Sequence, residues 1–424
     1  MGSNSDHFII RQKEIKAREL RFNDPAQSPI ISASSWKGLP LEPDKETAAS
    51  KKDSRIAAHV LVPYIRSTET FIYDRIVHAQ TFVPAVLSDE PVRNIDMFPF
   101  KPIHTLADRP PLSRKAHHML KRVLDYLPFF HEMIRRLKPR IIHAHYGPVG
   151  AALVGLRRKT GVPLVTSFYG VDASALLRQD YYRKLYARLW DEGDMISVLS
   201  AQMKQALMDA GCPEEKIRIH HLAVNTDDMQ PRPDPGSRYP ALVLCAGRLV
   251  EKKGHHILLE ALAQARRHAD IQCDLAGEGP LESELKGLAV KLGIHEAVRF
   301  HGGVSRTRVL ELMQGAHIFA LLSRTAADGD MEGTPTALIE AGALGMPAVS
   351  TTHAGIPEII EHGATGLLVP ENEPAAAAAA LFRLACDPDL RAQMGAAARA
   401  RILDRFSIAT VIRAIEADYE SLIT

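Results

Sequence analysis

Short runs of aliphatic and β-branched residues alternate with helical patterns along the chain from Arg55 onward. A strand followed by a helix, repeated many times, predicts a parallel sheet with crossover helices, as in a doubly wound α/β domain. The expected strands in the first half are Ile56–Pro63, Phe82–Leu87, Arg140–His145, Pro163–Phe168, Met195–Leu199 and Ile217–Leu222. The expected helices there are Leu112–Lys138, Val149–Lys159 and Ala201–Ala210.

The same pattern restarts after residues 231–240, where four of ten residues are proline. Proline continues neither a helix nor a central strand, so we expect a hinge linker there. The expected strands beyond it are Ala241–Ala246, Ile271–Ala276, Val298–His301, His317–Leu322, Ala348–Thr351 and Gly366–Val369. The expected helices are His255–His268, Leu281–Leu292, Arg306–Gln314 and Thr336–Leu344. Two such units would place a cleft between the carboxyl ends of two sheets, where α/β folds bind ligands.

The length of 424 residues indicates two domains, since single hydrophobic cores stop growing near ~250–300 residues. The expected division is a partly disordered extension at 1–54, a first Rossmann-like domain at 55–230, the hinge at 231–240, a second Rossmann-like domain at 241–405 and a C-terminal helix at 406–424. We expect that helix to pack back towards the first domain.

The composition is that of an ordinary globular protein, with 46% hydrophobic and 24% charged residues. No apolar run reaches the ~18 residues of a membrane span and no signal peptide is recognisable, so we expect a cytoplasmic protein. The four cysteines lie far apart without a zinc-binding pattern, and we expect all of them to be buried. They are Cys212, Cys245, Cys273 and Cys386.

Charge is unevenly distributed between the two halves. Residues 1–230 hold 33 Lys and Arg against 26 Asp and Glu, a net charge of +7, whereas residues 231–424 hold 19 against 24, a net charge of −5. A basic first half suits an anionic membrane surface or a phosphate-bearing ligand, although a solvated basic face without a ligand fits equally well.

The expected strand Ala241–Ala246 runs into a loop with two cations, Arg248 and Lys253, between Gly247 and Gly254. An Arg supplies a planar fork and a Lys a compact charge, a combination that suits two linked phosphates, while glycines let backbone approach a ligand closely. The alternative is a solvated basic turn.

A second loop contains Glu332 and ends at Thr334, which is expected to cap the helix that follows. Pro335 would then occupy the first helical position. The free N–H groups of such a helix start bind phosphate, so this loop and the two cations could hold one diphosphate. Glu332 and Glu340 carry carboxylates that accept hydrogen bonds from sugar hydroxyls.

Four features follow one another in a characteristic order: Gly247-Arg248-x4-Lys253-Gly254, Gly277-Glu-Gly-Pro280, the Glu332/Glu340 pair and Gly355-Ile-Pro-Glu358. In this order they resemble the retaining GT-B glycosyltransferases often labelled glycosyl transferases group 1. The resemblance covers roughly residues 55–424 and is strongest over 241–370. The segments Thr325–Gly333 and Ser67–Ile72 are similar to the branch that builds colanic acid and related exopolysaccharides.

The resemblance implies a GT-B fold, in which two doubly wound Rossmann-like domains face each other across a cleft. The N-terminal domain would bind the acceptor and the C-terminal domain the nucleotide sugar. The implied donor-binding residues are Gly247, Arg248, Lys253, Glu278, Glu332, Gly333, Thr334 and Glu340. Of these, Arg248, Lys253 and Glu332 would also be catalytic: Arg248 and Lys253 would bind the diphosphate and Glu332 the transferred sugar. Glu340 would bind the ribose.

The implied activity is that of a retaining, metal-independent hexosyltransferase, with the nucleotide diphosphate sugar as co-substrate and no cofactor. The donor expected first is a uridine diphosphate hexose, and the second is guanosine diphosphate mannose. The acceptor would be a saccharide or a lipid-linked saccharide, used to build an exopolysaccharide, a capsule or lipopolysaccharide. Nucleic acid is not an expected partner.

The expected first domain departs from the family at two places. The family's His-Gly-x-Asp is replaced by Tyr169-Gly-Val-Asp172, so Asp172 is carried over as a catalytic residue and Tyr169 only as a cleft residue on the acceptor side. The family's glycine-rich turn is replaced by a segment containing Glu69, a second acceptor-side candidate. His145 is a third, with a structural role equally open.

Several patterns imitate metal sites. The sequence Asp328-Gly-Asp330 resembles a metal-binding Asp-x-Asp, and with Glu332 it resembles the start of a calcium loop. The twelfth position of such a loop would be Ile339 rather than a glutamate, so we expect no bound metal.

The segment 112–140 combines eight Lys and Arg residues with Leu127, Phe129 and Phe130. It could lie on a membrane surface at the inner face of the cytoplasmic membrane, or it could be an ordinary amphipathic core helix. Two rival functions also stay open: a nucleotide-sugar epimerase on the same architecture, and an inactive sugar-nucleotide-binding subunit.

Overall fold

The computed structural model describes residues 55–424 except 67–68, 228, 232–234 and 237–239. The expected extension at 1–54 lies outside the described residues, as does most of the expected hinge at 231–240.

The first half of the described chain forms a seven-stranded sheet, and every strand pair in it is parallel. The strand order is β3-β2-β1-β4-β5-β6-β7. The strands are β1 (Ile56–Val60), β2 (Val83–Ser88), β3 (Ile103–Thr105), β4 (Ile141–His145), β5 (Leu164–Ser167), β6 (Met195–Val198) and β7 (Ile217–Ile219). The helices are α2 (Thr70–Val77), α3 (Pro111–Leu124), α4 (Pro128–Leu137), α5 (Gly147–Thr160), α6 (Asp180–Glu192) and α7 (Ala201–Asp209).

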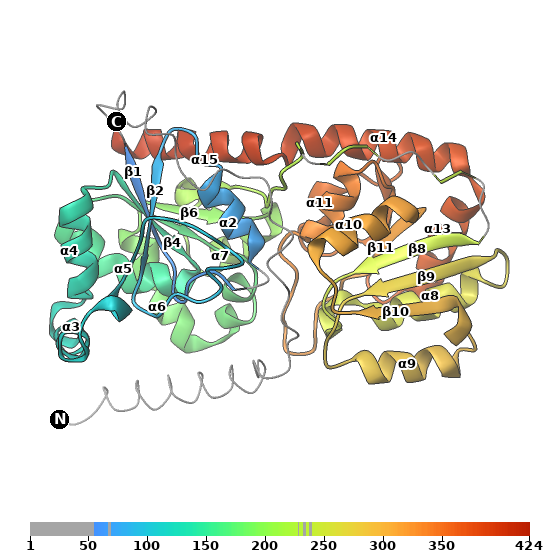
Figure 1. The fold of residues 1–424 in the computed structure, drawn as a ribbon, viewed down its shortest axis with the longest axis horizontal. Helices are drawn as coiled ribbons and strands as arrows, with labels where there is room; N and C mark the ends of the chain where they lie inside the picture. Colours follow the sequence, from blue (N-terminus) through green and yellow to red (C-terminus); the bar gives the residue numbers. More distant parts are fainter. Residues whose placement is uncertain (1–54, 67–68, 228, 232–234, 237–239) are drawn as a thin grey trace. The chain divides into compact units, whose positions relative to one another are not determined.

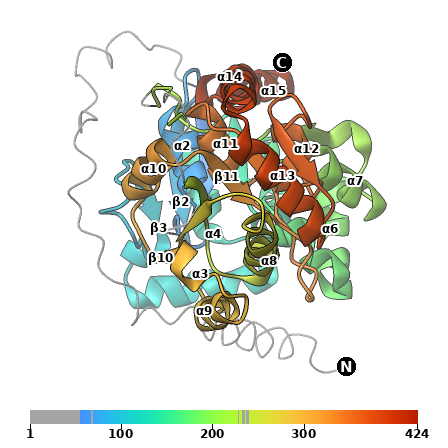
Figure 2. The same cartoon turned by 90° about the vertical axis from the view of Figure 1, so that its right-hand side faces the viewer.

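The second half forms a six-stranded parallel sheet with the order β10-β9-β8-β11-β12-β13. Figure 1 labels β8, β9, β10 and β11 of this sheet. Its strands are β8 (Ala241–Ala246), β9 (Ile271–Ala276), β10 (Val298–Gly302), β11 (Ile318–Leu321), β12 (Ala348–Thr351) and β13 (Gly366–Val369). Its helices are α8 (His255–Ala265), α9 (Glu282–Lys291), α10 (Arg306–Gly315), α11 (Thr336–Ala343), α12 (Ile356–Ile359), α13 (Pro374–Cys386) and α14 (Pro388–Arg405). Helices α8 and α13 pack side by side, as the end-on view in Figure 2 shows.

Each sheet reverses its strand order once, between β1 and β4 in the first and between β8 and β11 in the second. Loops that leave the carboxyl ends of neighbouring strands on either side of such a point diverge and leave room for a ligand. The predicted doubly wound α/β class is therefore confirmed for both halves, and the candidate site residues follow the carboxyl ends of β1, β4, β5, β8, β9 and β11.

Helix α15 (Ile408–Ile423) belongs to the core of the first sheet although it ends the chain. Its apolar residues form a cluster with the starts of the first sheet's strands, including Ile141 and Val165. The carboxylate of Glu416 accepts hydrogen bonds from the backbone N–H groups of Gln80, Thr81 and Phe82, at 2.9, 2.9 and 3.0 Å. These three bonds fix the turn before β2 onto the helix.

Three expectations from the sequence are wrong in detail. The single helix expected over Leu112–Lys138 is two helices, because Asp125 takes a left-handed conformation with φ 59° and ends α3. Strand β3 was not expected, since three residues carry too little pattern. Thr334 does not cap the helix after it: α11 begins at Thr336, and the Thr334 hydroxyl donates instead to the carbonyl of Leu199.

Cysteine burial also differs from the expectation. Cys212, Cys245 and Cys273 are buried, but Cys386 is exposed at the end of α13. In the described part of the chain, none of the helices has the length and apolar character needed to cross a bilayer.

Candidate functional site

The loop after β8 brings its two cations to the carboxyl end of the second sheet. Arg248 is exposed, and the Lys253 side chain passes beside Gly247. Gly254 has φ 63°, and a Cβ there would lie 1.8 Å from the carbonyl oxygen of Leu322. Only glycine fits this position, so the turn that carries Lys253 is held against the end of β11.

The loop after β9 packs directly on this turn. A Cβ on Gly277 would lie 1.9 Å from the carbonyl oxygen of Gly247, so the two backbones touch. Leu249 donates its backbone N–H to the carbonyl of Glu278 at 2.9 Å. The side chain of Glu278 is exposed, with its carboxylate over Gly303. The predicted donor residues Gly247, Arg248, Lys253 and Glu278 thus share one connected loop pair.

The loop between β11 and α11 faces these cations. Lys253 Nζ lies 3.1 Å from Glu332 Oε1, and both side chains are largely buried. Burial would raise the pKa of Glu332, but the charges of Lys253 and Lys252 outweigh it and lower that pKa below its ordinary value. Glu332 is therefore held as a carboxylate next to a cation.

The carboxylates of the Asp328-Gly-Asp330 pattern bind other groups of the protein. Asp330 Oδ2 pairs with Lys252 Nζ at 3.0 Å, and Asp328 Oδ1 accepts the backbone N–H of Asp330 at 2.9 Å. Metal independence stays a prediction.

Glu340 lies inside α11, near its middle, and is buried. Its Oε1 accepts from Arg306 Nε of α10 at 2.7 Å. The predicted ribose ligand is therefore already one half of an ion pair, which orients one carboxylate oxygen towards α10.

Two residues that the sequence did not single out contact the Glu332 loop. The imidazole of His353, fully buried after β12, accepts the backbone N–H of Glu332 at Nε2 (3.1 Å) and lies 2.6 Å from Glu371 Oε1 at Nδ1. The other oxygen of Glu371, after β13, accepts the backbone N–H of Thr325 at 2.9 Å. His353 lies two residues before the family motif Gly355–Glu358 in the sequence, and this position could have marked it as a candidate site residue.

In the first sheet, the turn after β5 is organised by Asp172. Its buried carboxylate accepts three backbone N–H groups, from Gly147 at 3.0 Å, Tyr169 at 2.9 Å and Gly170 at 3.0 Å. Burial raises the pKa of Asp172, while these hydrogen bonds oppose the rise. Both oxygens are thus occupied by backbone, which was not apparent from the sequence.

Tyr169 and His145 form a buried pair. The Tyr169 hydroxyl lies 2.6 Å from His145 Nδ1, and the Tyr169 ring packs against Phe71 and Tyr146 with centroids 5.1 and 5.0 Å away. Glu69 is also buried, and its carboxylate accepts from the Tyr146 hydroxyl at 2.7 Å. The three acceptor-side candidates therefore join one aromatic network, although their polar atoms are paired inside it.

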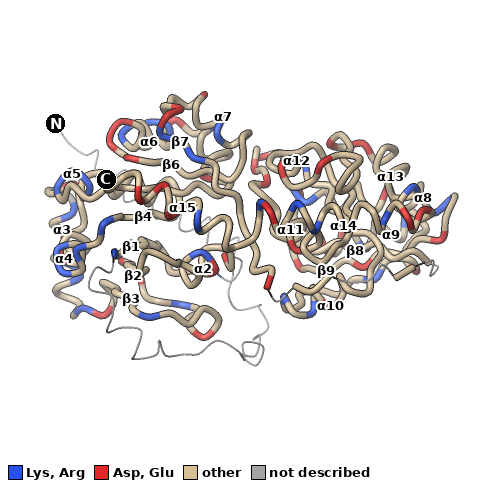
Figure 3. The backbone as a smooth tube through the Cα atoms, turned by 90° about the horizontal axis from the view of Figure 1, so that it is seen from above, with Lys and Arg blue, Asp and Glu red and all other residues tan. Residues whose placement is uncertain are grey.

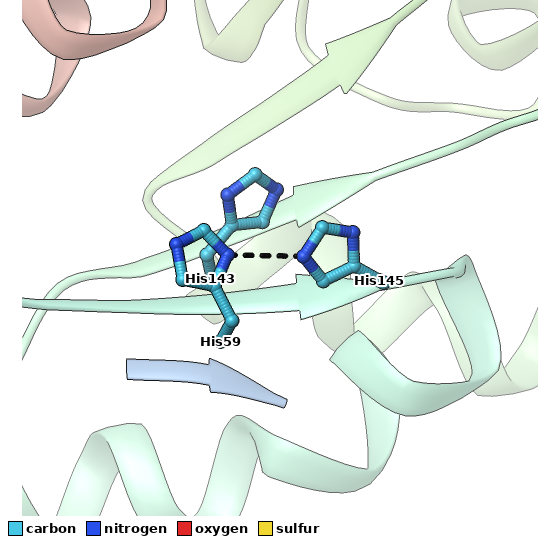
Figure 4. A group of neighbouring side chains, drawn as sticks. All are labelled: His59, His143 and His145. Carbon is cyan, nitrogen blue, oxygen red and sulfur yellow. Dashed lines mark hydrogen bonds between the residues drawn. The ribbon is translucent and has the colours of Figure 1, made fainter. Parts of the chain in front are cut away.

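His59, His143 and His145 form a group in which one nitrogen from each lies within 4.8 Å of the others (Figure 4). However, the rings of His143 and His145 are stacked at 11°, so their in-plane lone pairs do not converge on a point. His59 Nδ1 and His145 Nε2 are already 3.1 Å apart, as a hydrogen bond. Burial, with Arg75 nearby, lowers the pKa of His59 to about 3. The group is a neutral hydrogen-bonded network rather than a built metal site.

The turn after β5 and the loop before α11 are in contact. A Cβ on Gly333 would lie 2.7 Å from the carbonyl oxygen of Tyr169, and one on Gly170 would lie 3.9 Å from the Gly333 nitrogen. Thr334 Oγ1 donates to Leu199 after β6 at 3.2 Å. Lys253, Glu332, Gly333 and the Tyr169 turn consequently form one continuous site. Glu340 lies beyond it in α11, and Glu278 lies in the neighbouring loop after β9.

Comparison with known proteins agrees with this geometry. Residues 232–401 match the family described as Glycosyl transferases group 1, and residues 89–228 match Glycosyltransferase Family 4. Over 385 residues the chain is 30% identical to the amylovoran biosynthesis glycosyltransferase AmsK of Erwinia amylovora, covering 80% of this chain and 93% of AmsK.

A second relative is the putative colanic acid biosynthesis glycosyltransferase WcaL of Escherichia coli K12, 37% identical over 239 residues. That match covers 55% of this chain and 59% of WcaL. Among solved structures, Anabaena HepE in complex with UDP superposes with a TM-score of 0.70 at 18% identity, over 87% of this chain and 100% of HepE. The chain therefore belongs to the glycosyl transferases group 1 family of GT-B fold, in the branch that includes the colanic acid and amylovoran enzymes.

Proposed function

We propose that the protein transfers a hexose from a nucleotide diphosphate sugar to a lipid-linked saccharide during the synthesis of an exopolysaccharide, a capsule or lipopolysaccharide. The observation that carries the proposal is the buried Lys253–Glu332 pair at 3.1 Å, next to the start of α11. In the proposed reaction, this cation would meet the departing diphosphate and the neighbouring carboxylate would accept hydrogen bonds from the sugar hydroxyls.

In the proposed mechanism, the bond between the anomeric carbon and the diphosphate breaks while negative charge grows on the diphosphate. Arg248, Lys253 and the backbone N–H groups of Gly333 and Thr334 would stabilise that charge, a role in which one donor is commonly worth ~10²–10³ in rate. Glu332 would hold the sugar, and Glu340 the ribose. Fixed cations would do the work of a metal ion, and the configuration at the anomeric carbon would be retained.

For the first sheet we propose a positioning role for Asp172 in place of a chemical one, because its oxygens accept three backbone N–H groups. These bonds set the backbone of Tyr169 and Gly170 against Gly333. Tyr169, His145 and Glu69 would shape the acceptor side through their shared aromatic network.

A panel of nucleotide sugars tests the proposed function. In a thermal-shift screen we expect stabilisation by a UDP-hexose first and by GDP-mannose second, since HepE was solved with UDP and other relatives are named GDP-mannose-dependent mannosyltransferases. Ligand at 100 times its Kd would add about 2.7 kcal/mol to the free energy of unfolding. Failure of every nucleotide sugar to bind would overturn the proposal.

Incubation with the bound nucleotide sugar alone separates transfer from the epimerase alternative. A transferase releases at most a little free hexose, whereas an epimerase forms a new nucleotide sugar. The glycosyltransferase names of the relatives favour transfer.

The lipid-linked acceptor is proposed because of helix α3. Successive helix residues are about 100° apart, so Leu112, Met119 and Val123 lie on one face of α3. These side chains are 82%, 66% and 81% exposed. The helix packs on α4 through a different face, where the His117 ring meets Phe129 edge-on. An ordinary amphipathic core helix buries its apolar face, whereas α3 directs an apolar stripe into solvent.

The charge of α3 matches an anionic bilayer. Its sequence holds four Lys and Arg residues and neither Asp nor Glu, and α4 ends with Arg135 and Arg136 (Figure 3). Each such cation near an anionic lipid surface contributes about 1 kcal/mol. We propose that α3 lies in the headgroup region at the inner face of the cytoplasmic membrane, where a lipid-linked acceptor is presented.

Liposome flotation tests this placement. The triple variant Leu112→Ser, Met119→Ser, Val123→Ser should bind anionic vesicles at least about tenfold more weakly, since each lost contact removes apolar burial. A matched control changes exposed apolar residues of the other half, Val290→Ser and Leu403→Ser, and should bind as the original protein does. Equal flotation of both variants, or binding independent of salt and of anionic lipid, would contradict the α3 surface.

A further inference from the structure

We propose that His353 and Glu371 are positioning residues for the nucleotide sugar: together they hold both ends of the loop that presents Glu332 and Gly333. This inference rests on the proposed function, since it concerns how tightly the donor is bound.

The pair reaches the loop at two points. Glu371 accepts the backbone N–H of Thr325 with one oxygen (2.9 Å) and contacts His353 Nδ1 with the other (2.6 Å). His353 Nε2 then accepts the backbone N–H of Glu332 at 3.1 Å. Thr325 lies near the start of the loop and Glu332 near its end. The Glu371 carboxylate therefore holds the start directly and the end through His353.

The contacts determine the tautomer of His353. A backbone N–H can only donate, so the Nε2 atom that faces Glu332 must carry a lone pair. The ring proton therefore lies on Nδ1 and is donated to Glu371. The imidazole acts as a rigid bridge, because its side chain is 0% exposed and cannot turn away.

Positioning by the pair is needed because the loop is long and its tip is exposed. Within it, Gly329 has φ 84° and Asp328 is exposed. The tip is also linked to Lys252 and Glu251 of the β8 turn, and the Arg178 guanidinium packs against Gly329. A shift of about 1 Å in a substrate-holding group can cost on the order of 10²-fold in rate. The pair connects the loop to β12 and β13, the strands nearest to it in sequence after α11.

Variants of Glu371 test the span. In Glu371→Gln, one carboxylate oxygen becomes an NH₂ group. The remaining oxygen can accept from only one of the two donors, so either the Thr325 bond or the His353 bond is lost. We expect its Kd for UDP or GDP, measured by titration calorimetry, to rise about tenfold. The matched control is Glu373→Gln, two residues on and exposed, with an expected unchanged Kd. Circular dichroism and melting curves check that each variant is folded at the titration temperature.

Variants of His353 separate the two links. An asparagine side chain places its amide where Nδ1 lies, so His353→Asn keeps the bond to Glu371 and loses the one to Glu332. A glutamine side chain reaches the place of Nε2, so His353→Gln keeps the acceptor for Glu332. We expect His353→Gln to recover most of the nucleotide affinity that His353→Asn loses, which a purely structural role would not produce.

Kinetics add a third measurement. With the best nucleotide sugar of the panel, the Glu371→Gln variant should show a raised donor KM together with a lowered kcat/KM of at least about tenfold, while the acceptor KM stays constant. A folded Glu371→Gln variant with the Kd and KM of the original protein would overturn the inference. If the original protein itself binds neither UDP nor GDP, the proposed function fails instead.

Discussion

At the scale of single residues, the proposed mechanism assigns the chemistry of the site to Lys253 and Glu332. Their 3.1 Å contact joins the β8 turn to the α11 loop. We expect Lys253→Met to lower kcat/KM by about 10²–10³, because the variant loses a fixed charge next to the leaving diphosphate. Steady-state assays with the donor identified by the panel measure this loss. Lys291→Met, on exposed α9, is the control and should retain activity.

The same variant has a pH signature. In the original protein the pKa of Glu332 is lowered, so its contribution to stability is present above the unfolded pKa and is lost as pH falls through the folded pKa. Without Lys253, burial dominates and raises that pKa above its unfolded value of about 4.3. The Lys253→Met variant should then gain stability, relative to the original protein, as pH falls from 7 to 5. Melting curves that differ by a constant amount across this range would contradict this.

Asp172 gives a second prediction at this scale. Asp172→Ala leaves three buried backbone N–H groups without an acceptor, and each such group costs roughly 1–3 kcal/mol. We therefore expect Asp172→Ala to be strongly destabilised in urea unfolding. Asp172→Asn keeps one acceptor oxygen and should retain measurable transfer activity. Complete loss of activity in a folded Asp172→Asn variant would contradict the positioning role and support the catalytic role expected from the sequence.

At the scale of elements, one residue of α15 holds the turn before β2, beside the helix's apolar contacts with the first sheet. Glu416 accepts three N–H groups from the turn before β2, and its removal leaves all three unpaired in a partly buried place. We expect Glu416→Ala to lower the free energy of unfolding by about 2–4 kcal/mol. Arg413→Ala, exposed on the same helix, should change it by less than about 0.5 kcal/mol. Urea titrations of both variants make the comparison.

Much of the element pattern was predictable from the sequence. Strands such as β8 and β9 are buried runs bounded by polar or glycine residues, and their limits agree with the expectation. Local pattern failed where one residue decides the outcome. Asp125 divides α3 from α4 through its backbone conformation, and nothing in the periodicity of the flanking residues records this.

The site was predictable in its residue types more than in its contacts. The Lys253 and Glu332 neighbourhood followed from the family motifs, yet the pairing of Glu340 with Arg306 joins two successive helices across the strand and loop between them. The hydrogen bond from Gly147 to Asp172 and the contact between Tyr169 and His145 likewise arise only when β4 and β5 lie side by side. Such contacts depend on tertiary packing, so no local pattern reports them.

At the scale of the whole molecule, the proposed mechanism assigns the neutralisation of the diphosphate to the protein's own cations. We expect transfer to continue in excess EDTA, with added Mg²⁺ or Mn²⁺ changing kcat by less than about twofold. Initial rates with and without the chelator measure this. Activity that required a divalent ion would show that Arg248 and Lys253 are insufficient, and would return attention to Asp328 and Asp330.

The place of α15 in the first sheet's core has a consequence during synthesis. A ribosome completes β1 to β7 long before it makes Ile412 and Ile415, which cover the starts of those strands. Until α15 emerges, the nascent first half keeps an apolar surface uncovered and its β2 turn unanchored. Translation arrested within the second sheet would therefore release an aggregation-prone intermediate that binds chaperones, rather than an independently folded domain.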